Sequence, residues 1–440
     1  MKHLTNIFRI TKNLISLFNL NFKKVFFGFI NNGNPITPSK KTLLKSLIYS
    51  NKKEIRKLYE NNFSNLIGDG YGLAFAACRM AFYFILQNHN IKKGDEVLIL
   101  GFNCSVMANA VIKAGATPIY HDIDPETFGS CPQSIKRLIS PKTKAIVAQH
   151  SFGIPCKIDE IQTLAKLKGI LLIEDCALTL GSKIGEKKVG TFGDYAIFST
   201  DHSKPINTLI GGFLYTENEN FFNRILINYR NLNELTINHQ KKLLQQLEFE
   251  SKFCNNKSYK RFKFFSFIKE ISRRILHQDD PYLRLDNSSI NHQKYPYPAK
   301  MPIFLCKYGL EIISNFKESC REREENLEYF IKEYKNKDFD IILSSVYFSD
   351  SLTIMPNRII WNHSNKANLK IKLSRFLDVD DFWFEAPIIS TNLDLEHFKY
   401  TQGSCPNAEF SSMQIINLPV NMSKDEFKVL LNYFCRAISL

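Results

Sequence analysis

From residue 54 onward, short apolar runs alternate with helical stretches, and this alternation restricts the possible fold more than any other feature of the chain. The runs VLIL, AIVA and LLI are apolar throughout instead of alternating with polar residues. Such runs are typical of strands in a mostly parallel sheet that helices cover on both faces. Ligands of these sheets bind beyond the carboxyl ends of the strands, where Asp122, His150 and Asp175 fall. The pattern therefore predicts an α/β fold with its site at that edge.

The stretch from Leu171 to Phe213 carries the groups with the clearest chemistry. The run LLI ends on Glu174 and Asp175, and a second run, YAIFS, leads to Ser199 and then to Lys204. An amine, a buried carboxylate and a hydroxyl are what pyridoxal phosphate needs for its covalent bond, its ring nitrogen and its phosphate. These residues alone leave a second interpretation open, in which Asp175 ends a core strand and Lys204 is a solvated loop residue.

Composition narrows the class of protein. The 440 residues are enough for two domains, and 58 Lys and Arg against 43 Asp and Glu give a net charge of +15. The ten cysteines are scattered singly, without zinc spacing, which predicts reduced thiols, no metal site and a cytoplasmic protein. We expect no signal peptide and no membrane-spanning helix, because no apolar run approaches the length that either would need. No segment resembles a nucleic-acid recognition module, so we expect no nucleic acid as a partner.

Two segments concentrate the positive charge. Residues 1–53 contain ten Lys or Arg and no acid, and residues 257–276 contain seven basic residues, one acid and five aromatic residues. Basic segments with interleaved apolar residues are typical of helices that lie on an anionic membrane surface. The alternative is that their apolar faces pack on the protein body while the lysines stay solvated.

Several motifs together resemble the sugar-nucleotide aminotransferases of the DegT type (DegT/DnrJ/StrS). They are EDCALTLGS, VGTFGDYAIFS, the lysine followed after six residues by Gly-Gly, GDEV, AGATP, QHSFGIP and, near the end, INLPVN. The resemblance covers most of residues 55–440, with 230–300 excepted. It implies the type I fold of pyridoxal-phosphate transferases, similar to aspartate aminotransferase, with a large mostly parallel sheet domain and a smaller C-terminal α/β domain. We expect an N-terminal extension at 1–53, the large domain at 54–230, an insertion at 231–300 and the small domain at 301–440, where residues 301–334 predict one long amphipathic helix.

The resemblance also implies roles for single residues. Lys204 would hold the cofactor covalently and move protons, Asp175 would pair with the ring nitrogen, and Ser199 would bind the phosphate. Cys78 and Arg79 stand at a helix start where the family binds the phosphate, so either backbone N–H groups or the Arg79 charge would serve there.

One further position has the residue that is typical of the family, and three have a different residue. His150 occupies a position that the family also fills with histidine, which implies a contact near the cofactor or substrate. Cys104 stands where the family has an aromatic ring on the cofactor, Leu178 where it has a glutamine, and Pro298 near an asparagine that the partner subunit supplies.

The activity that the resemblance implies is amino transfer by a homodimer, with glutamate as donor, to a nucleotide-linked keto-sugar for surface polysaccharide or lipopolysaccharide. The basic segments add the expectation that this cytoplasmic protein contacts the inner face of the membrane. One alternative is a different pyridoxal-phosphate reaction on a sugar, such as dehydration, although the relatives that perform it replace the lysine with histidine. The other is a catalytically inactive member that acts as a binding or scaffold protein.

Overall fold

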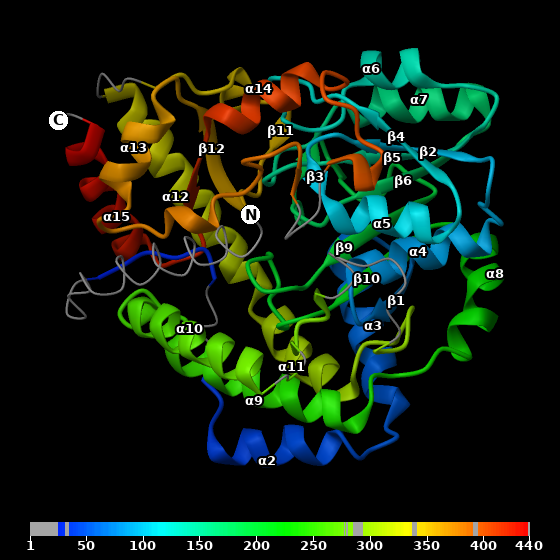
Figure 1. Ribbon diagram of the computed structural model, residues 1–440, viewed down its shortest axis with the longest axis horizontal. Helices are drawn as coiled ribbons and strands as arrows, with labels where there is room; N and C mark the ends of the chain where they lie inside the picture. Colours follow the sequence, from blue (N-terminus) through cyan, green and yellow to red (C-terminus); the bar gives the residue numbers. More distant parts are fainter. Residues whose placement is uncertain are drawn as a thin grey trace.

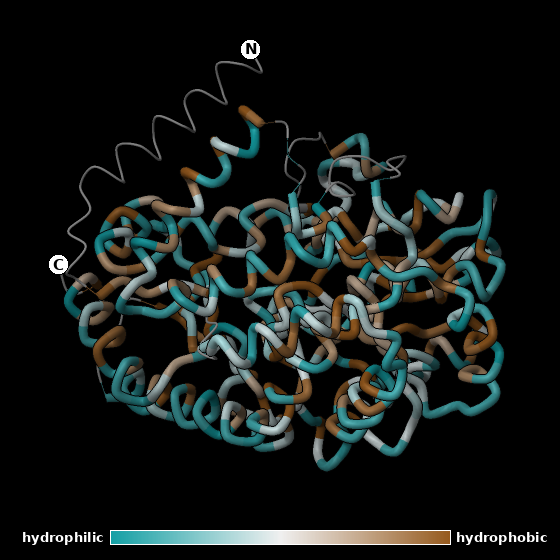
Figure 2. The backbone as a smooth tube through the Cα atoms, turned by 90° about the horizontal axis from the view of Figure 1, so that it is seen from below, coloured by the Kyte–Doolittle hydropathy of each residue, from teal (hydrophilic) through white to brown (hydrophobic). Residues whose placement is uncertain are grey.

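The computed structural model describes residues 25–30, 35–276, 278, 280–284, 294–336, 341–389 and 395–438. Hydrophobic stretches run through the middle of the molecule, and most of its outer turns are hydrophilic (Figure 2). The large sheet and its helices lie on one side, and helices α12, α13 and α15 lie on the other (Figure 1).

A seven-stranded sheet forms the larger part, in the order β1-β10-β9-β6-β5-β2-β4. Strands β9, β6, β5, β2 and β4 are parallel to one another, whereas β10 pairs antiparallel with both β1 and β9. The predicted α/β class with a mostly parallel sheet is therefore confirmed. The strands are β1 (Tyr71–Phe75), β2 (Glu96–Leu100), β4 (Thr117–His121), β5 (Thr143–Gln149), β6 (Leu171–Asp175), β9 (Tyr195–Ser199) and β10 (Gly212–Thr216).

Helices cover both faces of this sheet, as the apolar strands require. Successive residues of a strand point to opposite faces, so Val97 and Ile99 join the main core while Leu98 joins a second cluster under α6 and α7. The covering helices are α4 (Cys78–Asn88) and α5 (Ser105–Lys113) on one face and α6 (Pro132–Leu138) and α7 (Ile158–Lys168) on the other.

The first described helix lies beside helices of the predicted insertion. Helix α9 (Ile237–Phe253) contacts both α2 (Pro38–Leu47) and α10 (Tyr259–Ile275), as Figure 1 also shows. Phe27 is fully buried, and its backbone N–H donates to the Phe376 carbonyl oxygen over 2.8 Å. Residues 25–30 are therefore packed into the body, whereas the predicted basic helix before them lies outside the described residues. Among the described residues up to 300, the remaining helices are α3 (Lys53–Ile67) and α8 (Glu219–Arg230).

The C-terminal part has a two-stranded antiparallel sheet flanked by helices. The long helix predicted at 301–334 is wrong as one element, because it is interrupted at Asn315, whose N–H bonds to the Ile312 carbonyl instead of continuing the ladder. The elements are α11 (Ile303–Ser314), α12 (Phe316–Asn336), β12 (Arg358–Asn362), α13 (Lys366–Leu373), α14 (Pro406–Gln414), β14 (Ile415–Pro419) and α15 (Lys424–Ile438).

Short strands pair between the part that contains the large sheet and the C-terminal part. Strand β11 (Leu352–Thr353) pairs with β7 (Lys183–Ile184), which pairs with β8 (Lys187–Lys188), and β13 (Ile388–Ile389) runs parallel to β3 (Asn103–Cys104). The 3-10 turns are η2 (Ser345–Phe348), η3 (Val379–Asp381) and η4 (Leu395–Phe398). The limits of the four predicted domains stay a prediction.

Candidate active site

Asp175 and Ser199 end two neighbouring parallel strands. Asp175 is the last residue of β6 and pairs with Ile197 of β9, two residues before Ser199. The carboxyl group of Asp175 is 4% exposed and accepts the Ala177 backbone N–H over 3.0 Å. Burial raises the pKa of Asp175, while this N–H, Lys204 and His150 act in the opposite direction.

Lys204 lies in the loop between β9 and β10. Ser203, directly before it, has φ 72°, in the left-handed region that residues other than glycine rarely adopt, which is common at functional sites. Burial lowers the pKa of Lys204, and the Arg358 charge lowers it further, whereas Asp201, Cys104 and Asp175 act to raise it. The Lys204 side chain is thus half-buried, and its amine lies within the field of two carboxylates.

Two residues from the C-terminal part complete this environment. The Lys204 Nζ lies 4.3 Å from the centroid of the Trp383 ring, and the Arg358 guanidinium lies 3.5 Å from the same centroid. Asn417 Oδ1 accepts N–H groups from both Trp383 and Arg358, each over 3.0 Å, which fixes the ring and the guanidinium together. Neither Trp383 nor Arg358 could be predicted from the sequence as part of the site, because neither belongs to a motif and both lie far along the chain from Lys204.

The start of α4 forms another wall. No side chain caps this helix at Ala77, so no capping side-chain oxygen accepts its first backbone N–H groups. A Cβ on Gly212 would lie 2.2 Å from the Cys78 nitrogen, so β10 approaches the helix start as closely as only glycine allows. Burial raises the pKa of Cys78, and the charges of Asp175 and Lys204 also act on its thiol. The helix start therefore lies beside the carboxyl and the amine.

Arg79 points toward a different neighbour. Its guanidinium is buried and donates to the Leu283 carbonyl oxygen. Of the two alternatives for holding an anion, this contact favours the backbone N–H groups of α4.

His150 is held inside the protein. Its Nε2 lies 3.1 Å from Glu174 Oε2, and its Nδ1 accepts the Cys156 backbone N–H over 3.0 Å. Its backbone N–H donates to the Asp175 carbonyl over 3.1 Å. We infer that His150 positions the end of β6, and the direct contact with cofactor or substrate stays a prediction.

His150, Glu174 and Cys176 also bring possible metal ligands within 4.8 Å of one another. The Glu174 oxygens, however, already accept the backbone N–H groups of Gly190, Phe192 and Gly193. Nδ1 of His150 is occupied as well. This cluster is therefore a buried hydrogen-bond network that supports the strand carrying Asp175.

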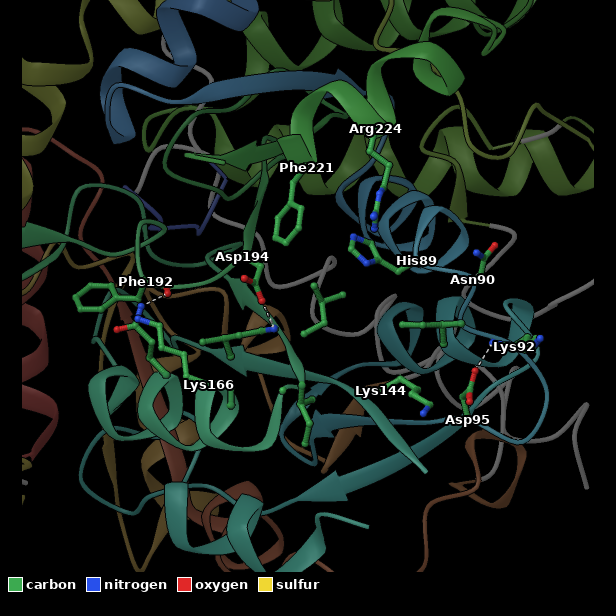
Figure 3. Close-up of a pocket in the computed structure, with 17 residues that line it drawn as sticks. His89, Asn90, Lys92, Asp95, Lys144, Lys166, Phe192, Asp194, Phe221 and Arg224 are labelled. Atoms are coloured by element: carbon green, nitrogen blue, oxygen red, sulfur yellow. Dashed lines mark hydrogen bonds between the residues drawn. The ribbon is translucent and has the colours of Figure 1, made fainter. Parts of the chain in front are cut away.

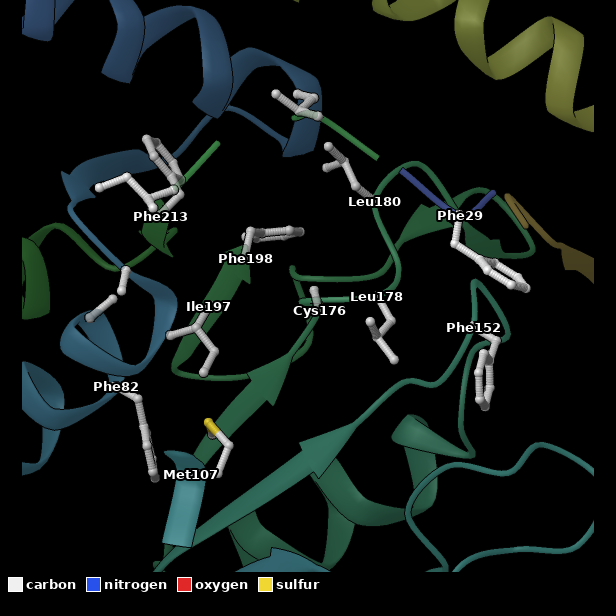
Figure 4. Close-up of a cluster of buried hydrophobic side chains, with 14 of the residues drawn as sticks. Phe29, Phe82, Met107, Phe152, Cys176, Leu178, Leu180, Ile197, Phe198 and Phe213 are labelled. Carbon is white, nitrogen blue, oxygen red and sulfur yellow. The ribbon is translucent and has the colours of Figure 1, made fainter. Parts of the chain in front are cut away.

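Cys104, Leu178 and Pro298 are the remaining predicted site positions, and each lies in a different environment. Cys104 is half-buried at the end of β3 and is one of the groups that act on Lys204. Leu178 is 5% exposed and lies in the apolar cluster with Cys176 and Phe152 (Figure 4). Pro298 is half-buried and lies in a segment whose Tyr297 contacts Tyr83 of α4.

Asp122, the remaining strand-end acid, does not join the site. Its carboxylate accepts the N–H groups of Asn407 and Ala408, both over 2.9 Å, at the start of α14. It therefore caps a helix of the C-terminal part.

A lysine and a buried acid at the carboxyl ends of a seven-stranded sheet, closed by a smaller C-terminal part, define the fold class of the pyridoxal-phosphate transferases. The sequence pattern of the DegT/DnrJ/EryC1/StrS aminotransferase family matches residues 35–252. The chain belongs to this family.

The relatives agree with this assignment over part of their length. The chain is 36% identical to GDP-perosamine synthase of Escherichia coli over 183 residues, which are 42% of this chain and 50% of that protein. It is 35% identical to UDP-N-acetyl-3-dehydro-alpha-D-glucosamine 3-aminotransferase of Acidithiobacillus ferrooxidans over 158 residues, 36% of this chain and 43% of that protein. The matches thus span about half the length of these relatives or less.

Solved structures are similar over nearly the whole chain. An aminotransferase from Psychrobacter cryohalolentis has a TM-score of 0.69 at 17% identity, with 93% of this chain and 99% of that one covered. A putative sugar aminotransferase from Streptococcus pneumoniae, in a structure named as its PLP-form, has a TM-score of 0.65 at 15% identity, with 93% and 98% covered. These similarities establish the predicted fold.

Proposed function

We propose that the protein is a pyridoxal-phosphate-dependent aminotransferase that converts a nucleotide-linked keto-sugar to an amino-sugar. The observation that carries this proposal is that a half-buried lysine amine and a buried carboxyl act on each other's ionisation at the carboxyl ends of the neighbouring strands β6 and β9. Membership in a family of aminotransferases supports the same reaction.

The residues present fit the cofactor. Asp175 offers a buried carboxyl that accepts the Ala177 N–H at Oδ1, and a carboxylate has further lone pairs with which it can accept from a ring nitrogen. The uncapped start of α4 suits a phosphate through its N–H groups and the helix dipole. Ser199 stands opposite Gly212, whose lack of a side chain lets β10 approach that helix start.

When bound, pyridoxal phosphate supplies an aldehyde that exchanges for an amine and a ring that accepts electrons. Lys204 serves as the amine that attaches the cofactor and, once released, as the base and acid that moves a proton at Nζ. Its lowered pKa increases the neutral fraction that both roles need. Asp175 holds a positive charge at the ring nitrogen, and Trp383 keeps water from the amine.

The substrate class is supported by the relatives, which are named for perosamine and for an amino-glucosamine linked to a nucleotide. Bacillus subtilis SpsC, 31% identical over 169 residues, is named a spore coat polysaccharide biosynthesis protein. We therefore propose a product that enters surface polysaccharide or lipopolysaccharide, with glutamate as the amino donor, and a homodimer as the assembly.

We also propose that the protein contacts an anionic membrane at its cytoplasmic face. Helix α10 packs through Tyr259 and Phe262, so the packing alternative holds for one of its faces. Its other face exposes Phe265, Ile268, Ile271, Ile275 and Leu276, by 38% to 70%. Arg261 and Arg274 are exposed beside these residues. Within the described part of the chain, no helix is both long and apolar enough to span a bilayer.

The test of the proposed reaction is to add pyridoxal phosphate, reduce with borohydride and map the labelled peptide. We expect the adduct on Lys204 and its loss in Lys204→Ala. Lys187→Ala is the matched control, because Lys187 also lies over an aromatic ring, 4.0 Å from the centroid of Phe192. An adduct on another lysine, or none, would reject the assignment and favour the scaffold alternative. Amino transfer to a panel of nucleotide-linked keto-sugars then identifies the substrate.

A further inference from the structure

A cavity of about 650 Å³ opens at the edge of the sheet opposite the candidate active site. Asp95, Lys144 and Leu171 line it where β2, β5 and β6 begin, whereas Asp175 and Ser199 stand where strands end. Helices α7 and α8 close its sides with Lys166 and with Phe221 and Arg224 (Figure 3). The cavity is therefore separated from the candidate active site by the length of the strands.

Four basic residues and two acids line the cavity, which gives its lining an excess of positive charge. Lys92, Lys144, Lys166 and Arg224 line it, and in the described part of the chain none of them forms an ion pair. Its two acids are engaged: Asp95 accepts the Lys92 backbone N–H over 3.0 Å, and Asp194 accepts that of Leu172 over 2.8 Å. The arrangement suits an anion.

One wall is aromatic. Phe221 and His89 line the cavity, and their ring centroids lie 5.8 Å apart in an edge-to-face arrangement. His89 Nε2 lies 3.1 Å from the Tyr195 hydroxyl, which fixes the imidazole. Burial, assisted by the Arg224 charge, lowers the pKa of His89 to about 4, so this ring is neutral near pH 7. A neutral aromatic wall beside basic side chains is suited to a flat ring that carries phosphates.

We propose that this cavity is a second binding site, for a nucleoside diphosphate. The phosphates contact Lys144 and Lys166, and the base packs on Phe221 and His89. The volume falls within the range of about 300 to 1,000 Å³ that small-molecule sites occupy. The proposal does not depend on the proposed reaction, because none of these residues belongs to the candidate active site.

The test is calorimetric titration of the full-length protein with UDP, GDP and inorganic pyrophosphate. We expect the nucleotides to bind more tightly than pyrophosphate, because only they offer a base. In the double variant Lys144→Gln, Lys166→Gln, nucleotide affinity should fall about tenfold or more, since each removed charge takes a charge-assisted bond with it. Lys168→Gln on the same helix, outside the cavity, should leave the affinity unchanged.

The candidate active site would also accept a nucleotide, so the titration should resolve two classes of site, of which the double variant weakens one. The double variant separates them, because it changes the cavity and leaves every residue of the candidate active site in place. Unchanged nucleotide affinity in the double variant, pyrophosphate binding as tight as that of the nucleotides, or an equal loss in Lys168→Gln would each overturn the proposal.

Discussion

Asp175 is the residue that we expect to keep the ring nitrogen of the cofactor positively charged. Asp175→Asn should retain bound cofactor yet lower turnover by several orders of magnitude, because an amide cannot hold the ring nitrogen positive, and about 1.4 kcal/mol of barrier corresponds to each factor of ten. The measurement is the rate of amino transfer, divided by the amount of bound cofactor that its absorbance gives. Near-normal turnover in this variant would show that another group takes this role.

Asp201 sets the ionisation of the neighbouring lysine. Its charge raises the pKa of Lys204 against the lowering by burial. Asp201→Asn removes that charge, so the pKa of Lys204 should fall, and the pH midpoint for covalent attachment of pyridoxal phosphate should move to lower pH. The exposed Asp159, changed to asparagine, serves as control. A midpoint that rises or stays constant would contradict the assignment.

Trp383 gives the site a spectroscopic label. The chain has two tryptophans, and Trp361 is 1% exposed among Phe330 and Phe434, away from Lys204. Pyridoxal phosphate bound at Lys204 should quench the Trp383 fluorescence strongly, and Trp383→Phe should abolish most of that quenching and weaken cofactor affinity. Equal quenching in the variant would mean that the cofactor binds elsewhere.

At the scale of elements, the contact between β10 and α4 decides how the phosphate end is built. Gly212→Ala should destabilise the protein by roughly 1–3 kcal/mol through overpacking and should also weaken cofactor binding, because the Cβ would displace the helix start. Gly169→Ala is the control: it sits at φ 61° in open space, so it should cost about 1 kcal/mol of stability without affecting the cofactor. Thermal unfolding and cofactor titration of both variants distinguish these effects.

The elements that could be predicted are those whose signal is local. Apolar strands ending on Asp175 and Ser199 predicted both the parallel sheet and the edge where the site lies, since neighbouring parallel strands end together. The role of Asp122 could not be predicted from the sequence. Its carboxylate caps α14, and only the tertiary packing places this helix beside Asp122. Trp383 and Arg358 were missed for the same reason. The interruption at Asn315 was missed because the apolar pattern continues through it.

At the scale of the whole molecule, we expect the exposed face of α10 to decide membrane contact. The double variant Ile268→Ser, Ile275→Ser, or removal of residues 1–24, should weaken flotation with vesicles that contain anionic lipid. Ile227→Ser, at an equally exposed position on α8, should not. Binding should fade as salt rises, since basic residues near such a surface contribute about 1 kcal/mol each and are screened.

Wild-type protein that does not float with anionic vesicles at low salt would reject membrane contact. The removal should end at residue 24, because Phe27 and Phe29 are buried in the body and a longer truncation would damage the fold.

The contact of Phe27 with the C-terminal part has a consequence for synthesis of the protein. The Phe27 N–H bonds to the Phe376 carbonyl, and its carbonyl accepts the Asp378 N–H over 2.9 Å, so one of the first described residues is held by residues near the end of the chain. During translation, domains tend to fold in the order in which they leave the ribosome. The sheet up to β10 can form while the rest is being made. Phe26 can bond to Asn256 once that residue has emerged, but the two Phe27 bonds cannot form before residue 378 has emerged. A nascent chain of this protein therefore exposes the apolar side chains around Phe27 for much of its synthesis. We expect a chaperone to bind this segment.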